Sequence, residues 1–231
     1  MGSATFPGFG TGVRRFDADR ARNNTRAWFE ANRGRYEREV LGPAAAFVED
    51  MAPRLAKTWP DLAWGTQRTG AGSIMRIHRD VRFSPDTRPY KENLGVLLWI
   101  GPGAKMERPA FYFNLDARGA FFYAGYHFLP KPALARYRDA VADGKRGAAL
   151  ERILARLAAG GLEVMEAPAY KRVPAGYPSD HPRATLLRHD GLGVFTELGA
   201  AEVADPGLTV RLAAVALKAR RLVDWLLQIA E

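Results

Sequence analysis

Residues 110–128 decide the fold, and they read Ala-Phe-Tyr-Phe-Asn-Leu-Asp-Ala-Arg-Gly-Ala-Phe-Phe-Tyr-Ala-Gly-Tyr-His-Phe. Apolar residues alternate on both sides of Asp116 to Gly119, which is the pattern of two strands joined by a tight turn. One face of this predicted hairpin is apolar and consists of Phe111, Phe113, Leu115, Phe122, Ala124 and Tyr126. The other face carries aromatic rings with polar tips and further polar groups, namely Tyr112, Asn114, Tyr123 and His127.

Helical patterns lie on both sides of this hairpin. A first helix is expected to begin near Asp17 or Asp19, because acidic residues are favoured in a first turn. Gly42-Pro43 is expected to end it and to start a second helix, in which Pro53 should introduce a kink or a restart. Further helices are predicted over residues 130–141 and 147–157, and a last one over about 206–230.

The nearly continuous apolar run from Asn93 to Ile100 predicts a central strand of the same sheet. Strands and helices do not alternate as in a doubly wound sheet. We therefore expect a single α+β domain over residues 1–231, with a largely antiparallel sheet flanked by N-terminal and C-terminal helices.

The composition limits the classes of function. The chain has 231 residues, 47% of them hydrophobic, and it contains no cysteine, which excludes disulfides, thiolate metal sites and a cysteine nucleophile. We see no secretory signal and no apolar run long enough to span a membrane, so a soluble, cytoplasmic protein without a membrane partner is expected. The net charge of +9 is spread over the chain and is only a weak indication of nucleic-acid binding.

Arg76 to Asn93 reads Arg-Ile-His-Arg-Asp-Val-Arg-Phe-Ser-Pro-Asp-Thr-Arg-Pro-Tyr-Lys-Glu-Asn and is the candidate site. Its cationic residues outnumber its two aspartates, and guanidinium groups bind phosphate or carboxylate through two hydrogen bonds. The candidate ligand-binding residues are Arg76, Arg79, Arg82, Tyr90, Lys91 and Asn93, together with Trp28 and Asn24 from the N-terminal region. The alternative is that the arginines and aspartates pair with one another and only brace a loop.

Asp80, Asp86 and His181 are the candidates for moving protons. His181 lies in a second polar segment, Tyr170 to Asp190, where Asp180 is expected to cap the helix carrying Leu186 and Leu187. The aspartates could instead bind a hard cation such as Mg²⁺, but the surrounding positive charges would compete, and no metal site is predicted.

Several motifs together resemble one family. They are Phe-Pro-Gly-Phe near the start, Asn23-Asn24 with Trp28-Phe29-Glu30, Arg76-x-x-Arg79-Asp80-x-Arg82-Phe83-Ser84-x-Asp86 with Pro89-Tyr90-Lys91, and Val173-Pro174-x-Gly176-Tyr177 with Asp180-His181-Pro182. This pattern resembles the DUF2461 family of soluble proteins of unknown function, from about Phe6 to about Val194. Members usually have Asp-Lys-Thr-Pro-Tyr-Lys where this chain has Asp-Thr-Arg-Pro-Tyr-Lys, so one positive charge is displaced by one position.

The resemblance supplies no reaction, and neither an enzyme activity nor a cofactor nor an oligomeric state is indicated. The leading hypothesis is an arginine-rich binding or catalytic site for a small anionic ligand that bears phosphate or carboxylate. The alternatives are a nucleic-acid-binding module, and a structural or partner-binding domain whose arginines and aspartates staple a loop.

Overall fold

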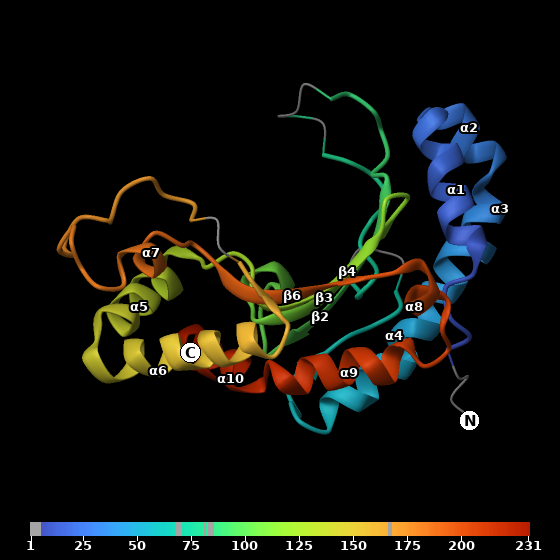
Figure 1. Cartoon of the computed structure of the whole chain (residues 1–231). Coiled ribbons are helices and arrows are strands. Elements are labelled where there is room, and N and C mark those ends of the chain that lie inside the picture. Colours follow the sequence, from blue (N-terminus) through green and yellow to red (C-terminus); the bar gives the residue numbers. More distant parts are fainter. Residues whose placement is uncertain (1–5, 68–70, 81, 83–85, 166–167) are drawn as a thin grey trace. The chain divides into compact units, whose positions relative to one another are not determined.

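A computed structural model of the chain describes residues 6–67, 71–80, 82, 86–165 and 168–231 (Figure 1). Among these residues, six strands form an antiparallel sheet in the order β1-β2-β3-β4-β6-β5, and helices flank it. The predicted α+β class is therefore confirmed. The strands are β1 (Leu62–Ala63), β2 (Asn93–Ile100), β3 (Ala110–Asp116), β4 (Ala120–Tyr126), β5 (Glu163–Val164) and β6 (Leu192–Leu198).

The predicted hairpin is β3 and β4, and all six side chains of its apolar face are buried. The Asp116 carboxylate closes the turn by accepting hydrogen bonds from the backbone N–H groups of Arg118 (2.8 Å) and Gly119 (3.1 Å). The predicted central strand is β2. These strands lie where the sequence has either period-two alternation or a short apolar run, each followed by a polar turn.

Contacts divide the chain into two compact units. Unit 1 consists of Met1–Leu98, Tyr112–Phe122 and Glu197–Ala214, and unit 2 of Trp99–Phe111, Tyr123–Thr196 and Val215–Glu231. That residues 1–231 form a single domain stays a prediction.

Unit 1 has a largely helical N-terminal part that packs on an aromatic core. Its helices are α1 (Thr11–Arg22), α2 (Arg26–Ala31), α3 (Arg33–Tyr36), the π-helical turn η1 (Glu37–Leu41), α4 (Gly42–Ala56), α8 (Ala200–Ala204) and the first part of α9 (Leu208–Lys218). The Phe113 ring of β3 stacks on Phe9, with ring centroids 5.2 Å apart, and contacts Phe47 of α4 at 4.9 Å. All three rings are buried, so they fix β3 against α4.

One expectation about these helices was wrong. The first helix begins at Thr11 rather than near Asp17 or Asp19, because the stripe Val13, Phe16 and Arg20 continues upstream and is buried. The expectation that a second helix starts at Gly42-Pro43 is confirmed, because the wider turn η1 ends at Leu41 and α4 begins at Gly42 with Pro43 in its first turn. The helix α4 also runs on through Pro53 to Ala56.

Unit 2 contains α5 (Lys131–Ala142), α6 (Gly144–Ala159), α7 (Ala184–Leu187), α10 (Arg220–Ala230) and the short 3₁₀ turn η2 (Lys105–Glu107). Asp143 caps α6 by accepting from the N–H groups of Lys145 and Arg146. The helix α10 contacts both α5 and α6 (Figure 1). Arg136 of α5 donates to the Ile229 carbonyl of α10 at 2.9 Å, which satisfies one of the carbonyls that a helix end leaves open.

The predicted last helix is interrupted. A turn at Ala219 separates α9 from α10, although the predicted apolar stripe runs through both. Six of its seven residues are buried, with only Val215 half-buried, as the stripe of Leu208, Leu212, Val215, Ala219, Leu222, Leu226 and Ile229 predicted. In the part of the chain that the structure describes, no helix is both long and apolar enough to cross a membrane.

Candidate functional site

The charged stretch is carried by a short ladder at the start of β2. Ile74 pairs with Val96 and His78 with Tyr90 in antiparallel bridges. Backbone hydrogen bonds from Met75 to Gly95 (2.9 Å) and from Lys91 to the Ile77 carbonyl (2.7 Å) join the same two segments. The alternation of residues 73–80 thus corresponds to an extended segment beside β2, with the charged loop at its end.

Most of the arginines in this loop are neutralised by its own aspartates. Arg79 and Arg88 both donate to Asp86, with N–O distances of 2.7 and 2.6 Å, and Arg88 also pairs with Glu92. Arg82 donates to Asp80 at 2.7 Å. The alternative in which Arg–Asp pairs brace the loop therefore accounts for three of its arginines.

These pairs also affect the two candidate catalytic aspartates. The hydrogen bonds from Arg82 lower the pKa of Asp80 to about 2. The hydrogen bonds from Arg88 hold the pKa of Asp86 well below its usual range. A general base works best with a pKa near the ambient pH, so both carboxylates are poor proton acceptors in this arrangement. A catalytic role for either aspartate stays a prediction.

Arg76 and Lys91 differ from the other cations of the stretch. Neither side chain forms a hydrogen bond or an ion pair with any residue that the structure describes. Arg76 is exposed and Lys91 is half-buried. Burial lowers the pKa of Lys91, and the positive charge of Arg76 lowers it further, so the two cations lie close enough to repel each other.

Asn24 links the N-terminal helices to this ladder. Its amide donates to the Tyr90 carbonyl at 2.9 Å and accepts from the Tyr90 N–H at 3.0 Å. The backbone groups of Tyr90 point away from the ladder, so the Asn24 amide takes the place of a neighbouring strand. The Tyr90 ring stacks on Phe29 of α2, with centroids 4.4 Å apart. Asn24 and Tyr90, both candidate ligand-binding residues, thus bind each other.

Two other candidate residues, Trp28 and Asn93, lie in different surroundings. Trp28 is half-buried and packs on Phe16 of α1, with ring centroids 5.6 Å apart. Asn93 of β2 donates to Asn114 of β3 at 2.7 Å and to the Tyr112 hydroxyl at 3.4 Å. Burial raises the pKa of Tyr112, while the hydrogen bond from Asn93 opposes this shift. Asn93 therefore belongs to an uncharged polar cluster on the predicted polar face of the hairpin.

Glycines in neighbouring strands make room for the tyrosines of this face. A Cβ atom at Gly95 of β2 would lie 2.6 Å from the Tyr112 hydroxyl, and one at Gly193 of β6 would lie 2.3 Å from the Tyr123 ring. The Tyr123 hydroxyl donates to the Leu192 carbonyl at 3.1 Å. Each tyrosine side chain thus lies over a glycine of the neighbouring strand, in space that any larger residue at that position would occupy.

His181 and its segment belong to unit 2. The Nδ1 atom of His181 accepts from the Arg183 N–H at 3.0 Å, which gives the ring a structural partner; a catalytic role for His181 stays a prediction. The expectation that Asp180 caps the following helix was wrong, because α7 begins only at Ala184 and has no side-chain cap.

Arg183 was not singled out from the sequence, yet it organises this part of unit 2. Its guanidinium donates to the carbonyls of Val141 (2.6 Å), Ala142 (3.3 Å) and Asp143 (3.1 Å), and it pairs with Glu151. It therefore holds the junction of α5 and α6. Nothing in the local sequence distinguishes this arginine from its neighbours, because its partners lie about 40 residues away.

A buried ion pair in α1 was also missed. The Arg20 guanidinium and the Asp17 carboxylate lie 2.7 Å apart, and both side chains are only 1% exposed. Asp17 Oδ2 and Arg20 Nε form no hydrogen bond with any described residue. Burial, partly offset by Arg20, raises the pKa of Asp17 to about 7, and burial lowers that of Arg20. Both residues share the stripe of Val13 and Phe16, and this spacing is the signal that could have revealed them.

This ion pair predicts a pH dependence of stability. The pKa of Asp17 is about 7 in the folded protein and 3.8 in the unfolded chain. Between these two pH values the folded state therefore binds more protons than the unfolded state. The contribution of Asp17 to the free energy of unfolding is therefore largest below about pH 4 and falls as the pH rises to about 7. Urea unfolding of the native protein and of Asp17→Asn over this pH range should show a native stability that declines relative to the variant. Parallel curves would contradict this assignment.

Within the described residues, no group of three or more histidine, cysteine, aspartate or glutamate side chains is placed to hold a metal ion. Comparison with family models matches the chain to the family described as "Conserved hypothetical protein (DUF2461)" over residues 14–225. The resemblance predicted from the motifs is thereby confirmed, and the match extends beyond Val194 into α10. No curated protein and no solved structure matches the chain.

Proposed function

The chain belongs to the DUF2461 family, and from this premise we propose that it binds a small anion bearing phosphate or carboxylate at Arg76 and Lys91. One observation carries the proposal: these two cations are close enough to repel each other, yet neither forms an ion pair with a described residue, and the Asp80 carboxylate near Arg76 is held by Arg82. The arginines that lie between them in the sequence are held by Asp80 and Asp86 instead. The proposed site contains only two cations, whereas the arginine-rich site expected from the sequence also included Arg79 and Arg82.

An anion between Arg76 and Lys91 would remove an unfavourable interaction and form two charge-assisted hydrogen bonds. Lys91 is partly desolvated, so its attraction to an anion is screened less than that of a fully exposed lysine. The ladder of residues 74–79 and 90–96 fixes the backbone at both residues, which reduces the entropy lost on binding. The arrangement supports binding and assigns no reaction.

Thermal unfolding in low salt, with inorganic phosphate and then with phosphorylated and carboxylated metabolites, tests this proposal. A ligand at about 100 times its dissociation constant stabilises the folded state by about 2.7 kcal/mol, which is about 5–10 °C for a chain of this size. Hydrogen bonds to charged groups contribute about 1.5–3 kcal/mol. Arg76→Ala and Lys91→Ala should therefore each weaken binding at least about tenfold in calorimetric titration.

Arg82→Ala is the matched control, because Arg82 lies in the same stretch, is exposed, and is paired with Asp80. Its affinity for the anion should match that of the native protein. If Arg76→Ala and Lys91→Ala fold normally by circular dichroism and bind as tightly as this control, the proposed site is wrong. The same holds if no anion changes the unfolding temperature of the native protein.

A further inference from the structure

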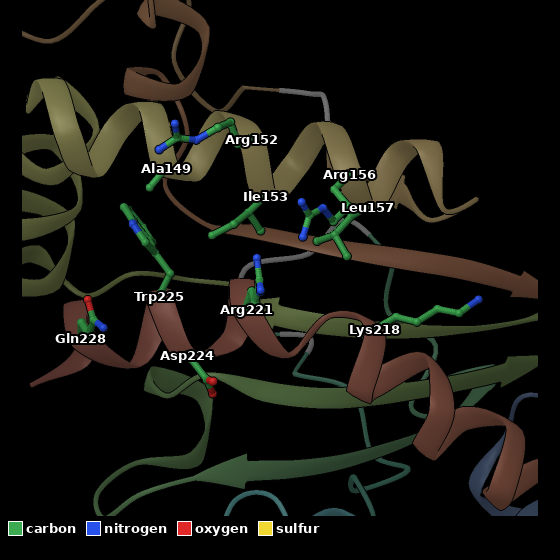
Figure 2. A pocket seen from close by; sticks show the side chains of 10 residues that line it. All are labelled: Ala149, Arg152, Ile153, Arg156, Leu157, Lys218, Arg221, Asp224, Trp225 and Gln228. Carbon is green, nitrogen blue, oxygen red and sulfur yellow. The ribbon is translucent and has the colours of Figure 1, made fainter.

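A groove in unit 2 runs between the helices α6 and α10. It has a volume of about 430 Å³, within the range of about 300–1,000 Å³ that is typical of ligand sites. Figure 2 shows its two walls, one from α6 and one from α10 and the end of α9. It lies outside the stretch of Arg76 to Asn93, and none of its lining residues was a candidate in the sequence.

The rim of this groove is strongly basic. Four exposed cations line it, and none of them forms an ion pair with a residue in the described part of the chain: Arg152, Arg156, Lys218 and Arg221. Arg156 and Arg221 stand on facing walls (Figure 2). The one acidic lining residue, Asp224, is engaged by Arg220 at 3.2 Å. The groove therefore has an excess of positive charge that its own residues do not neutralise.

The floor of the groove is apolar. Ile153 and Leu157 of α6 and Trp225 of α10 line it, and Figure 2 shows Ile153 and Trp225 directed into the space between the helices. The Trp225 ring packs edge-on against Tyr137, with centroids 6.1 Å apart and an interplanar angle of 89°, so its position is fixed. Ile153 stays half-buried and offers apolar surface to a ligand.

We propose that this groove binds a small amphiphilic anion, with its acidic head between Arg156 and Arg221 and its apolar body on Ile153 and Trp225. A ligand without charge would leave the cations unpaired, and an inorganic anion would leave the apolar floor in water. A second copy of this chain is disfavoured as the occupant, because its net charge of +9 would bring like charges together. A nucleic acid would use the basic rim and leave the apolar floor uncovered.

Calorimetric titration with four probes distinguishes the contribution of the acidic head to the affinity from that of the apolar tail. Decyl phosphate and decanoate carry both parts, inorganic phosphate carries only the head, and 1-decanol carries only the tail. Both amphiphiles should bind at least about tenfold more tightly than either partial probe, since the charge-assisted hydrogen bonds and the burial of apolar surface each contribute. Preference for one amphiphile would identify the head group as phosphate or carboxylate.

Variants of the lining residues test where the amphiphile binds. Arg156→Ala and Arg221→Ala should each weaken decyl phosphate about tenfold and leave 1-decanol unchanged, whereas Ile153→Ser should weaken both. Arg146→Ala is the matched control, because Arg146 is an exposed arginine of the same helix outside the groove. Its binding should equal that of the native protein.

Further outcomes of these titrations decide the proposal. Lys91→Ala should not alter the affinity for decyl phosphate, which separates this groove from the anion site proposed above. If Arg146→Ala and Arg156→Ala lose affinity equally, or if 1-decanol binds as tightly as decyl phosphate, the proposal is wrong. It is also wrong if neither amphiphile binds while an acidic amphipathic peptide does, because the groove would then dock a protein helix.

Discussion

Replacing Arg20 by alanine is expected to lower the free energy of unfolding by about 3–5 kcal/mol at pH 8, because the partner carboxylate stays buried without its counter-charge. Asp17 already has one oxygen without a hydrogen bond to a described residue, so it has no second donor to replace Arg20. Urea unfolding followed by circular dichroism gives the free energy directly.

The loss should be smaller at pH 5. Because the pKa of Asp17 is about 7 even beside Arg20, a buried Asp17 without Arg20 can take up a proton at pH 5 and become neutral. Arg15→Ala, an exposed position on the same helix, is the control and should change stability by less than about 0.5 kcal/mol. The double variant Asp17→Leu/Arg20→Met should recover most of the stability, since an apolar pair of similar volume avoids the desolvation of both charges. An Arg20→Ala variant as stable as the control at pH 8 would refute the buried ion pair.

Replacing Asn24 by alanine is expected to lower the free energy of unfolding by about 2–4 kcal/mol. The substitution removes both partners of the Tyr90 backbone, and Tyr90 is only 2% exposed. A buried N–H or carbonyl that loses its partner costs about 1–3 kcal/mol. The loss should appear as a lower urea midpoint with an unchanged slope.

Asn23→Ala is the matched control for this substitution, because Asn23 is the exposed neighbour and its amide bonds only the Asp19 carbonyl within the same helix end. It should cost less than about 1 kcal/mol. Anion affinity gives a second measurement. If Asn24 is structural, as its geometry indicates, Asn24→Ala should bind phosphate normally below its unfolding temperature. Equal losses for the two asparagine variants would contradict the role of Asn24.

The parts of the fold that the sequence predicted are those with local signals. The hairpin β3–β4 has period-two alternation and a turn closed by the side chain of Asp116, all within 17 residues. The stripe of the last helix was also correct, but its interruption at Ala219 was not predicted, since alanine carries no signal for a helix end.

The start of α1 shows where acidic residues mislead. Asp17 was interpreted as part of a first turn, because carboxylates are usually exposed and favour that position. In the structure it is buried in the middle of the helix, beside Arg20. The local propensity was outweighed by the pairing of the two charges, and the spacing of Asp17 and Arg20 with Val13 and Phe16 was the better guide to their burial.

The sequence predicted where the charged stretch lies in the fold better than it predicted how its charges pair, and that the stretch is a functional site stays a prediction. The charged stretch does lie at the end of a ladder beside β2, but most of its charge is neutralised locally. Asp80 binds Arg82, and Asp86 binds Arg88, each only two residues along the chain. A count of charges cannot separate paired cations from open ones, because pairing depends on how the loop turns. Arg76 and Lys91 were distinguished only when the partners of the others were known.

The tyrosines that lie across glycines impose a rule on any redesign of the sheet. At Gly95 a methyl group and the Tyr112 hydroxyl compete for the same space, and at Gly193 the competitor is the ring of Tyr123. A larger residue at either glycine therefore becomes acceptable only when the facing tyrosine is shortened in the same step. Each glycine is thus coupled to one tyrosine of the neighbouring strand, so engineering libraries that vary the glycine alone will not recover larger residues there.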